Sequence, residues 1–248
     1  MKKQVVIIPA LNPPEQLIEY VERLLDKGFP HVIVVNDGSN PSTHYIFNEL
    51  QNMEDCTVIV HNGNKGKGRA LKTAFSYCLN KFPTIEGVVT ADADGQHALE
   101  DVCRVSDFFA KNPNHLVLGI RNFHEANVPK RSYIGNTITS FGFYLLFRSK
   151  LQDTQTGLRA IPFSHLERMT LLKGERYEYE INMLIYAKKR KLGIREVVIQ
   201  TIYHNNNKGS YYRTIKDSLK IFHRIMAGFF NFNRQFKKQL KQAGDFDE

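Results

Sequence analysis

The chain has 248 residues, of which 42% are apolar and 24% are charged. A chain of this length and composition can bury a large core, which argues against an intrinsically disordered protein. Its three cysteines, Cys56, Cys78 and Cys103, show no C-x-x-C spacing. This argues against a disulfide scaffold and a zinc cluster and favours a reducing compartment.

No apolar stretch approaches the roughly 18–20 residues that a membrane span needs, and the N-terminal apolar run is too short for a signal peptide. We therefore expect a cytoplasmic protein.

The net charge of +9 is concentrated in the C-terminal quarter. Residues 186–241 hold 14 lysines and arginines but only two acids, Glu196 and Asp217, whereas the first 185 residues hold 20 bases and 20 acids. This asymmetry favours an anionic partner, either a nucleic acid or lipid head groups.

Apolar runs typical of strands alternate with helical patterns over the first 120 residues. The pattern predicts strands over 4–9, 31–36, 56–61, 87–92 and 115–120, and helices over 14–27, 43–52, 66–81 and 99–110. The strands are continuously apolar, which is typical of a parallel sheet covered on both faces. Beyond residue 121 the pattern predicts helices over 132–147 and 178–190, a strand over 194–200 and a long helix from 213. We expect an α/β fold with an open, doubly wound, mostly parallel sheet flanked by helices.

In such a sheet, ligands bind at the carboxyl ends of the strands. The first predicted strand ends at Pro9-Ala10-Leu11-Asn12 without a G-x-G-x-x-G pattern, which argues against binding of NAD or FAD. The glycine-rich, basic segment 63–73 lacks the pattern G-x-x-x-x-G-K-[ST], which excludes a Walker P-loop.

Two aspartates, Asp92 and Asp94, follow the fourth predicted strand, and Asp37 follows the second. In an extended segment, residues i and i+2 point the same way, so Asp92 and Asp94 would present two carboxylates to one point. Such a pair suits Mg²⁺ or Mn²⁺, which take oxygen ligands and complete their shell with phosphate and water. A D-x-D pair also fits a helix N-cap followed by a turn. The position after an apolar strand, beside Asp37, favours the metal.

Eight segments together resemble glycosyltransferase family 2, which has the GT-A fold, and in particular its dolichol-phosphate mannosyltransferase-like branch, which uses polyprenyl phosphates. They are IPALN (8–12), VVNDGS (34–39), NKGKGRALKTAF (64–75), TADADGQH (90–97), GIRNF (119–123), DTQTGLRAIP (153–162), GERYEYEINML (174–184) and IYHNNNKGSYYRTIKDSLKI (202–221). The resemblance implies an inverting, metal-dependent transfer of a sugar from a nucleotide diphosphate sugar to a polyprenyl phosphate. It also implies a catalytic domain over 1–212.

By this resemblance, one group of residues binds the nucleotide sugar and an overlapping group binds Mg²⁺ or Mn²⁺. The nucleotide-sugar group is Pro9, Ala10, Asn12, Asp37, Lys65, Asp92 and Ala93, and the metal group is Asp92, Asp94 and Gln96. Simpler structural roles fit several of them. Pro9 also suits the end of a strand, Asp37 an Asx-turn, and Lys65 with Lys67 a solvated loop. We expect His97 to cap a helix or face solvent rather than to bind the metal.

On the acceptor side, the resemblance implies Gln155, Thr156 and Gly157, which also fit a plain polar turn. The catalytic residues that it implies are Asp94, Arg121, Glu180 and Arg213. Guanidinium groups match two phosphate oxygens at once, and Arg131 and Arg159 are further candidates for this contact.

Family members that use hydroxyl acceptors often carry an Asp as general base, but here that stretch reads Glu178-Tyr179-Glu180. A phosphate monoester is already dianionic near pH 7 and needs no base, so the missing Asp agrees with a lipid-phosphate acceptor. Glu180 would then act as a base or only orient an arginine. A second departure is that Asn12 is followed by Pro13-Pro14 where the family often has Glu, which puts the donor contact of that Glu in doubt.

Close relatives often carry transmembrane helices after the catalytic domain, whereas this chain has a basic amphipathic helix and an acidic tail over 213–248. The apolar stripe of this helix comprises Ile215, Leu219, Phe222, Met226, Phe229, Phe236 and Leu240. Such a helix fits an anionic membrane surface, which predicts a peripheral protein on the cytoplasmic face. Packing on the catalytic domain and dimerisation are the alternatives.

Two other functions remain open from the sequence. One is a family 2 transferase with a saccharide or glycolipid hydroxyl as acceptor. The other is a non-catalytic nucleic-acid-binding or scaffolding protein with a decayed site. The intact Asp92 and Asp94 pair and the lack of an RNA-binding aromatic motif argue against a nucleic-acid partner.

Overall fold

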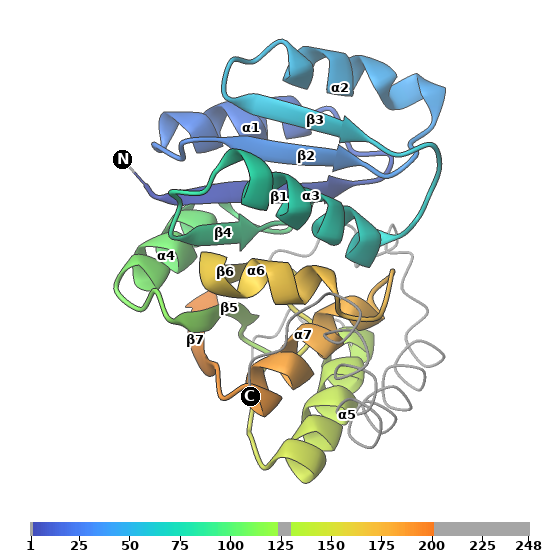
Figure 1. The fold of residues 1–248 in the computed structure, drawn as a ribbon. Coiled ribbons are helices and arrows are strands. Elements are labelled where there is room, and N and C mark those ends of the chain that lie inside the picture. The colour runs from blue at the N-terminus through green and yellow to red at the C-terminus, as the bar shows by residue number, and fades with distance from the viewer. Residues whose placement is uncertain (1, 124–129, 201–248) are drawn as a thin grey trace.

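A seven-stranded sheet forms the centre of the computed structural model, which describes residues 2–123 and 130–200 (Figure 1). The strand order is β3-β2-β1-β4-β6-β5-β7. The strands are β1 (Gln4–Ala10), β2 (Val32–Asn36), β3 (Cys56–Val60), β4 (Gly87–Thr90), β5 (His115–Arg121), β6 (Arg159–Pro162) and β7 (Gly193–Ile199). The helices are α1 (Leu17–Asp26), the 3-10 turn η1 (Pro41–Thr43), α2 (His44–Gln51), α3 (Lys67–Lys81), α4 (Leu99–Ala110), α5 (Lys130–Phe147), α6 (Phe163–Thr170) and α7 (Glu178–Lys189). The predicted mixed α/β fold with helices around a mostly parallel sheet is confirmed.

One strand, β6, runs antiparallel to both of its neighbours, β4 and β5, while the other strand pairs are parallel. Neither β6 nor the helix α6 that follows it is in the sequence prediction. β6 has only four residues, with Arg159 at one end and Pro162 at the other, so it has no apolar run long enough to mark a strand. Because β6 is antiparallel, its first residue lies at the edge where β4 and β5 end.

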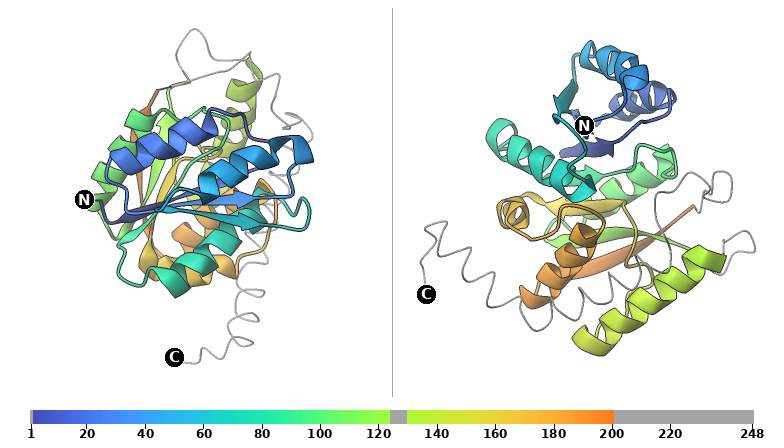
Figure 2. Two further views of the ribbon diagram at one scale, coloured as in Figure 1. Left: turned by 90° about the horizontal axis from the view of Figure 1, so that it is seen from above. Right: turned by 90° about the vertical axis from the view of Figure 1, so that its right-hand side faces the viewer.

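The sheet separates two apolar cores, one on each face. Helices lie on both sides of the sheet (Figure 2). Alternate residues of β1 enter opposite cores, with Val5 and Ile7 on one face and Val6 and Ile8 on the other. The helices α3, α6 and α7 cover the first face, and α1, α2 and α4 cover the second. The strands are therefore buried on both sides, which explains why they are continuously apolar.

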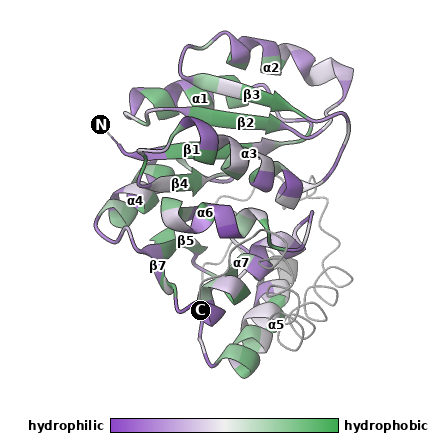
Figure 3. Cartoon of the chain, in the orientation of Figure 1, coloured by the Kyte–Doolittle hydropathy of each residue, from purple (hydrophilic) through white to green (hydrophobic). Residues whose placement is uncertain are grey.

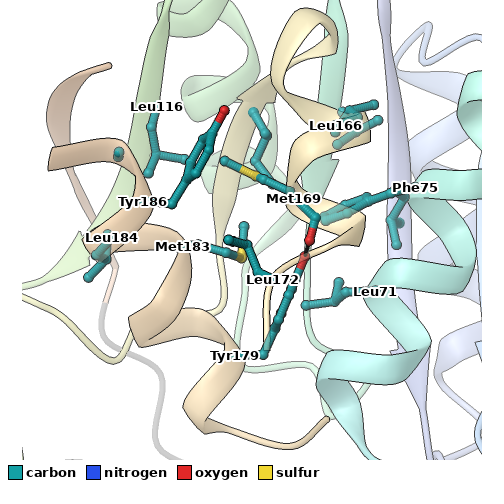
Figure 4. Packing of buried hydrophobic residues seen from close by; sticks show 14 of the residues in the cluster. Leu71, Phe75, Leu116, Leu166, Met169, Leu172, Tyr179, Met183, Leu184 and Tyr186 are labelled. Atoms are coloured by element: carbon teal, nitrogen blue, oxygen red, sulfur yellow. Dashed lines mark hydrogen bonds between the residues drawn. The ribbon is translucent and has the colours of Figure 1, made fainter. Parts of the chain in front are cut away.

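The first core joins α3, α6 and α7 on one face of the sheet (Figure 4). Tyr179 of α7 is fully buried there, and its hydroxyl donates a hydrogen bond of 2.8 Å to the carbonyl oxygen of Met169. A Cβ atom on Gly68 would lie 2.5 Å from Cβ of Tyr179, so only glycine lets the start of α3 approach α7 this closely. This contact sets the position of the first turn of α3 relative to α7.

Three sequence predictions fall on the segment after residue 200. The boundary at 212, the amphipathic helix over 213–248 and Arg213 all lie outside the described residues. Within the described part of the chain, the helices are all too short or too polar to cross a bilayer.

Candidate active site

The carboxyl edge of the sheet brings together the loops that follow β1, β2, β4 and β5. Pro9 and Ala10 are the last two residues of β1, where Pro9 is half-buried and Ala10 is buried. The carbonyl oxygen of Ala10 accepts a hydrogen bond of 2.9 Å from the backbone N–H of Asp37, which fixes the first two loops side by side.

Asp37 is buried and organises the basic loop that leads into α3. Its carboxylate accepts hydrogen bonds from the backbone N–H groups of Lys65, at 2.9 Å, and Gly66, at 2.7 Å. Nδ1 of His61 lies 2.7 Å from the same carboxylate, and Nε2 of His61 lies 3.0 Å from Oγ1 of Thr73. Asp37 therefore holds Lys65 at the carboxyl edge by its backbone. His61 was not predicted, because one histidine at a strand end carries no motif.

Asn12 joins the loops after β1 and β2. Its backbone lies in the left-handed region, with φ of 50°, which Asn tolerates better than most residues. Its Oδ1 accepts a hydrogen bond of 2.7 Å from the backbone N–H of Asn40, and its own N–H donates to Oγ of Ser39 at 2.9 Å. The side-chain oxygen of Asn12 thus holds the protein's own backbone.

The centre of the site is an ion pair network in which Lys67 lies between two carboxylates. Nζ of Lys67 is 2.6 Å from Oδ1 of Asp92 and 3.0 Å from Oε1 of Glu180. Burial opposes the charge on Lys67, but the two carboxylates outweigh it and raise the pKa of the lysine. Burial would likewise raise the pKa of Asp92, but Lys67 and His97 outweigh it and lower that pKa to about 2. Lys67 and Asp92 are therefore both charged at neutral pH.

The packing of α3 against α7 explains how Lys67 and Glu180 come to lie beside Asp92. Lys67 is the first residue of α3 and Glu180 lies in the first turn of α7, and the glycine contact between these helices brings both side chains to Asp92. From the sequence, Lys67 also fits a solvated loop. The structure instead pairs it with Asp92 and Glu180.

Asp94 and Gln96 lie in the turn that follows Asp92, with Ala93 half-buried between the two aspartates. Oδ1 of Asp94 accepts a hydrogen bond of 3.1 Å from the backbone N–H of Gln96. Desolvation and the negative charge of Asp92 raise the pKa of Asp94, which shows that the two carboxylates repel each other. A divalent cation would relieve this repulsion, and two carboxylates suffice for Mg²⁺ or Mn²⁺ when phosphate oxygens supply other ligands. The residues therefore fit the predicted metal, although the described residues contain no cluster of three or more His, Cys, Asp or Glu side chains that could hold an ion.

His97 does not cap a helix or face solvent, so that prediction is wrong. It is buried, and its Nδ1 accepts a hydrogen bond of 3.0 Å from the backbone N–H of Asp92. The carbonyl oxygen of His97 accepts a hydrogen bond of 2.9 Å from the hydroxyl of Tyr20 in α1. His97 thus anchors the turn that carries Asp92 and Asp94 to the core.

Arg121, at the end of β5, is held by Asp153. Its Nε lies 2.7 Å and its Nη2 3.0 Å from the two carboxylate oxygens of Asp153, in a two-point pair. Asp153 is fully buried and also accepts the backbone N–H of Gln155 at 3.0 Å. Asp153 lies in a segment that carried the family resemblance, but no role was predicted for it.

The predicted acceptor-side residues lie between Asp153 and β6. Thr156 is buried, and its hydroxyl donates to the carbonyl oxygen of Gly119 at 2.5 Å. The carbonyl oxygen of Gly157 accepts a hydrogen bond of 2.7 Å from the hydroxyl of Thr90. The segment 155–157 is therefore more than a polar turn, because it is bonded to both β4 and β5 beside Asp92.

Arg159 is not available to bind a phosphate, contrary to its inclusion among the candidates. It is 1% exposed, and its guanidinium donates to the carbonyl oxygens of Thr156, at 2.9 Å, and Glu180, at 2.6 Å. Arg159 ties the acceptor-side segment to α7. Arg131 lies in the first turn of α5.

A second salt-bridged contact holds the start of α3 against the loop before α7. Glu175 forms ion pairs with Nε of Arg69, at 2.6 Å, and Nζ of Lys72, at 3.1 Å. The carbonyl oxygen of Glu175 also accepts the backbone N–H of Arg69 at 3.0 Å. These residues line an adjoining hollow of about 560 Å³ and had no predicted role.

Residues 5–170 match the family model described as "Glycosyl transferase family 2". The chain is 34% identical over 240 residues to the UDP-N-acetylglucosamine--dolichyl-phosphate N-acetylglucosaminyltransferase of Methanococcus voltae, which covers 89% of this chain and 94% of the relative. It is 28% identical over 208 residues to the polyprenol monophosphomannose synthase of Mycolicibacterium smegmatis, covering 80% of this chain and 77% of that protein.

Among solved structures, the chain is similar to glucosyl-3-phosphoglycerate synthase from Mycobacterium tuberculosis, crystallised with Mn²⁺, UDP and glucosyl-3-phosphoglycerate. The TM-score is 0.65 at 18% identity, and the match covers all of this chain and 82% of the other. This likeness shows the GT-A fold that the sequence predicted.

Proposed function

The chain belongs to glycosyl transferase family 2, and from that premise we propose that it transfers a sugar from a nucleotide diphosphate sugar to a polyprenyl phosphate. The acceptor class is supported by the names of two relatives, which act on dolichyl phosphate and make polyprenol monophosphomannose. The nature of the donor is supported by the name of the first of these relatives, which includes UDP-N-acetylglucosamine.

The observation that carries the proposal is the pairing of Glu180 with Lys67. A hydroxyl acceptor must lose a proton to a positioned base as it attacks. Glu180 occupies the stretch where hydroxyl-using relatives have their base, but it is 6% exposed and its carboxylate lies 3.0 Å from the ammonium of Lys67. This carboxylate is engaged with Lys67 rather than free to face an acceptor hydroxyl. An acceptor that arrives as a phosphate dianion needs no base, so this arrangement favours a lipid phosphate.

Asp92 and Asp94 are the residues that would hold Mg²⁺ or Mn²⁺. When bound, the cation supplies positive charge to the diphosphate of the donor. Asp94 reaches the surface and is the more accessible of the two, whereas Asp92 is already paired with Lys67. We propose that Gln96 contributes only through its position in the same turn.

The transfer that we propose is a single in-line displacement with inversion. An oxygen of the acceptor phosphate forms a bond to the anomeric carbon of the sugar, and the bond from that carbon to the diphosphate oxygen breaks. The electron pair leaves with the nucleoside diphosphate. Arg121, oriented by Asp153, supplies positive charge for a phosphate at the carboxyl edge. Pro9, Ala10, Asn12, Asp37 and Lys65 form the loops on which the nucleotide would lie.

The test is transfer from radiolabelled UDP-, GDP- and dTDP-sugars to undecaprenyl or dolichyl phosphate, with Mn²⁺, with Mg²⁺ and with EDTA. We expect label in the organic phase that requires a divalent cation and is released by mild acid, because a glycosyl phosphate is acid-labile. An acid-stable product, or transfer only to saccharide acceptors, would contradict the lipid-phosphate assignment.

The variant Glu180→Gln separates a base from a structural counter-ion. If Glu180 is not a base, the Glu180→Gln variant should show the same pH dependence of transfer as the wild type. Any loss of rate should then come from the lost ion pair with Lys67. If the acidic limb of the pH profile, where activity falls as the pH falls, vanishes in this variant, Glu180 is the base and a hydroxyl acceptor is favoured.

A further inference from the structure

The helix α5 exposes an apolar face at one end of the molecule (Figure 1). Phe141 is 60% exposed and Ile134 is 51% exposed, and other large apolar residues of the helix are exposed by more than two fifths. Their spacing of three and four residues places them on one side of the helix. We call this side the outer face of α5, and it comprises Tyr133, Ile134, Ile138, Phe141, Tyr144 and Leu145. The last turns of α5 are correspondingly green in the hydropathy colouring (Figure 3).

The inner face of α5 carries buried polar residues in its first half, whereas Phe143, further along the same face, is buried in the first core. Oδ1 of the buried Asn136 accepts the backbone N–H of Thr154 at 3.1 Å. The hydroxyl of the buried Thr139 lies 2.8 Å from the hydroxyl of Thr154. The polar residues are needed inside because they hold the segment that carries Asp153. The large apolar side chains of the outer face are exposed to water, and an exposed apolar patch of this kind is typical of an interaction surface.

The charges around α5 indicate what covers its outer face. Residues 130–147 contain no aspartate or glutamate, and the sequence places Lys130 and Arg131 in the first turn. Arg148 and Lys150 follow the last turn and are exposed. A stripe of aliphatic and aromatic side chains between basic ends is typical of a helix that lies in a bilayer interface, where tyrosines are also enriched. Each basic residue near an anionic leaflet adds to the attraction.

We propose that the outer face of α5 docks on the surface of an anionic phospholipid bilayer. This proposal rests on α5 alone and not on the segment after residue 200, which lies outside the described residues. The same helix that contacts lipid holds the segment 152–156 on its other side, and Asp153 of that segment holds Arg121. Docking through α5 therefore places the acceptor side of the active site next to the head-group region. The proposal does not depend on the reaction that the enzyme performs.

The chain contains no tryptophan, so a single introduced indole reports on its own surroundings. The reporter variant is Phe141→Trp, and its matched control is Tyr45→Trp, at a 48% exposed position of α2 at the opposite end of the molecule (Figure 1). The full-length chain is mixed with vesicles of phosphatidylcholine and phosphatidylglycerol. We expect a blue shift and quenching by brominated lipid for F141W but not for Y45W. Equal emission of both variants with and without vesicles would overturn the proposal.

A second pair of variants measures the contribution to binding. The double variant Ile138→Asp with Phe141→Asp replaces two outer-face residues, and Tyr45→Asp with Val60→Asp replaces two exposed residues of α2 and β3. In vesicle co-sedimentation we expect at least about a tenfold loss of affinity for the first and little change for the second. Unchanged binding of the first variant would overturn the proposal.

Two further measurements on the same variants identify a different occupant. If I138D/F141D binds vesicles as the wild type does and melts at a lower temperature, the outer face is covered by the chain itself. If instead it converts a dimer into a monomer in sedimentation analysis, the face joins two copies. Either result would overturn the proposal.

Discussion

Gly157 lies so close to Asp92 that a Cβ atom at position 157 would be 2.6 Å from Oδ2 and 2.7 Å from Oδ1 of the aspartate. The same Cβ atom would lie 2.8 Å from Nζ of Lys67. The acceptor-side segment therefore packs directly on the Lys67–Asp92 ion pair. A Cβ atom at this position would force the charged ends of Asp92 and Lys67 to move.

We predict that Gly157→Ala separates Lys67 from Asp92 and lowers transfer by at least about tenfold, because the new methyl group must displace one of the two charged groups. Overpacking of this kind also costs about 1–3 kcal/mol in the free energy of unfolding. Steady-state kinetics and chemical denaturation measure the two effects. The control is Gly28→Ala, where a Cβ meets nothing within 4 Å and φ is +82°. It should lose about 1 kcal/mol of stability from backbone strain and keep full activity. Full activity of G157A would show that the contact is unimportant.

Replacing Asp94 by Asn should lower transfer by about 100-fold or more while leaving the fold intact. The aspartate reaches the surface and makes one side-chain hydrogen bond, to the N–H of Gln96, which an Asn oxygen can also accept. The loss would come from the missing negative charge toward the cation, an effect of the size seen for other electrostatic groups in active sites. Activity as a function of Mn²⁺ concentration, with the melting temperature as control, tests this. Wild-type turnover in D94N would remove Asp94 from the metal site.

Arg121 and Asp153 should behave as one unit. Asp153 has a fully buried side chain, so Asp153→Asn should cost about 3 kcal/mol in the free energy of unfolding, since it leaves the charge of Arg121 unbalanced. Arg121→Lys keeps a charge but loses the two-point geometry, and we expect a higher KM for the acceptor. In a double-mutant cycle, the two changes should be strongly non-additive in both stability and KM. Additive effects would mean that Asp153 does not position Arg121.

The thiols of Cys56 and Cys78 should be inert in the folded protein. Burial raises the pKa of each from the ordinary 9.0 to about 12. Burial also raises the pKa of Cys103, but Cys103 is only half-buried, so at about pH 8.5 a thiol reagent should modify it faster than the two buried thiols, and should modify all three cysteines in denaturant. Because unfolding lets the two buried thiols ionise, the free energy of unfolding should fall as the pH rises from 9 toward 12. Rapid native modification of Cys56 or Cys78 would contradict this.

Several features of the fold were predictable because local patterns decide them. The parallel strands over 4–10, 32–36, 56–60, 87–90 and 115–121 are continuous apolar runs, and each predicted helix near them has its apolar residues on one side. β6 and α6 were missed because β6 is a four-residue strand whose place in the sheet depends on partners far away in the chain. No local pattern records that dependence.

The candidate site divides in the same way. The segments that carried the resemblance contribute residues to the carboxyl edge where the structure describes them, segment 202–221 lies outside the described residues, and family membership is confirmed. The pairing of Lys67 with both Asp92 and Glu180 could not be read from the sequence. The three residues belong to separate segments, and each segment contains other charged residues that could have formed an ion pair instead. The same is true of His61 on Asp37, Asp153 on Arg121 and the burial of Arg159.

By itself, the sequence determined the family, the α/β architecture and the residues available for chemistry, because these depend on residue type, order and local periodicity. Only the tertiary structure decided which charges neutralise one another and which faces stay exposed. These depend on distances of a few ångströms between distant segments, where one close glycine contact such as that of Gly68 with Tyr179 sets which side chains meet. The outer face of α5 is the clearest case, because its large apolar side chains are exposed while Asn136 and Thr139 of the same helix are buried.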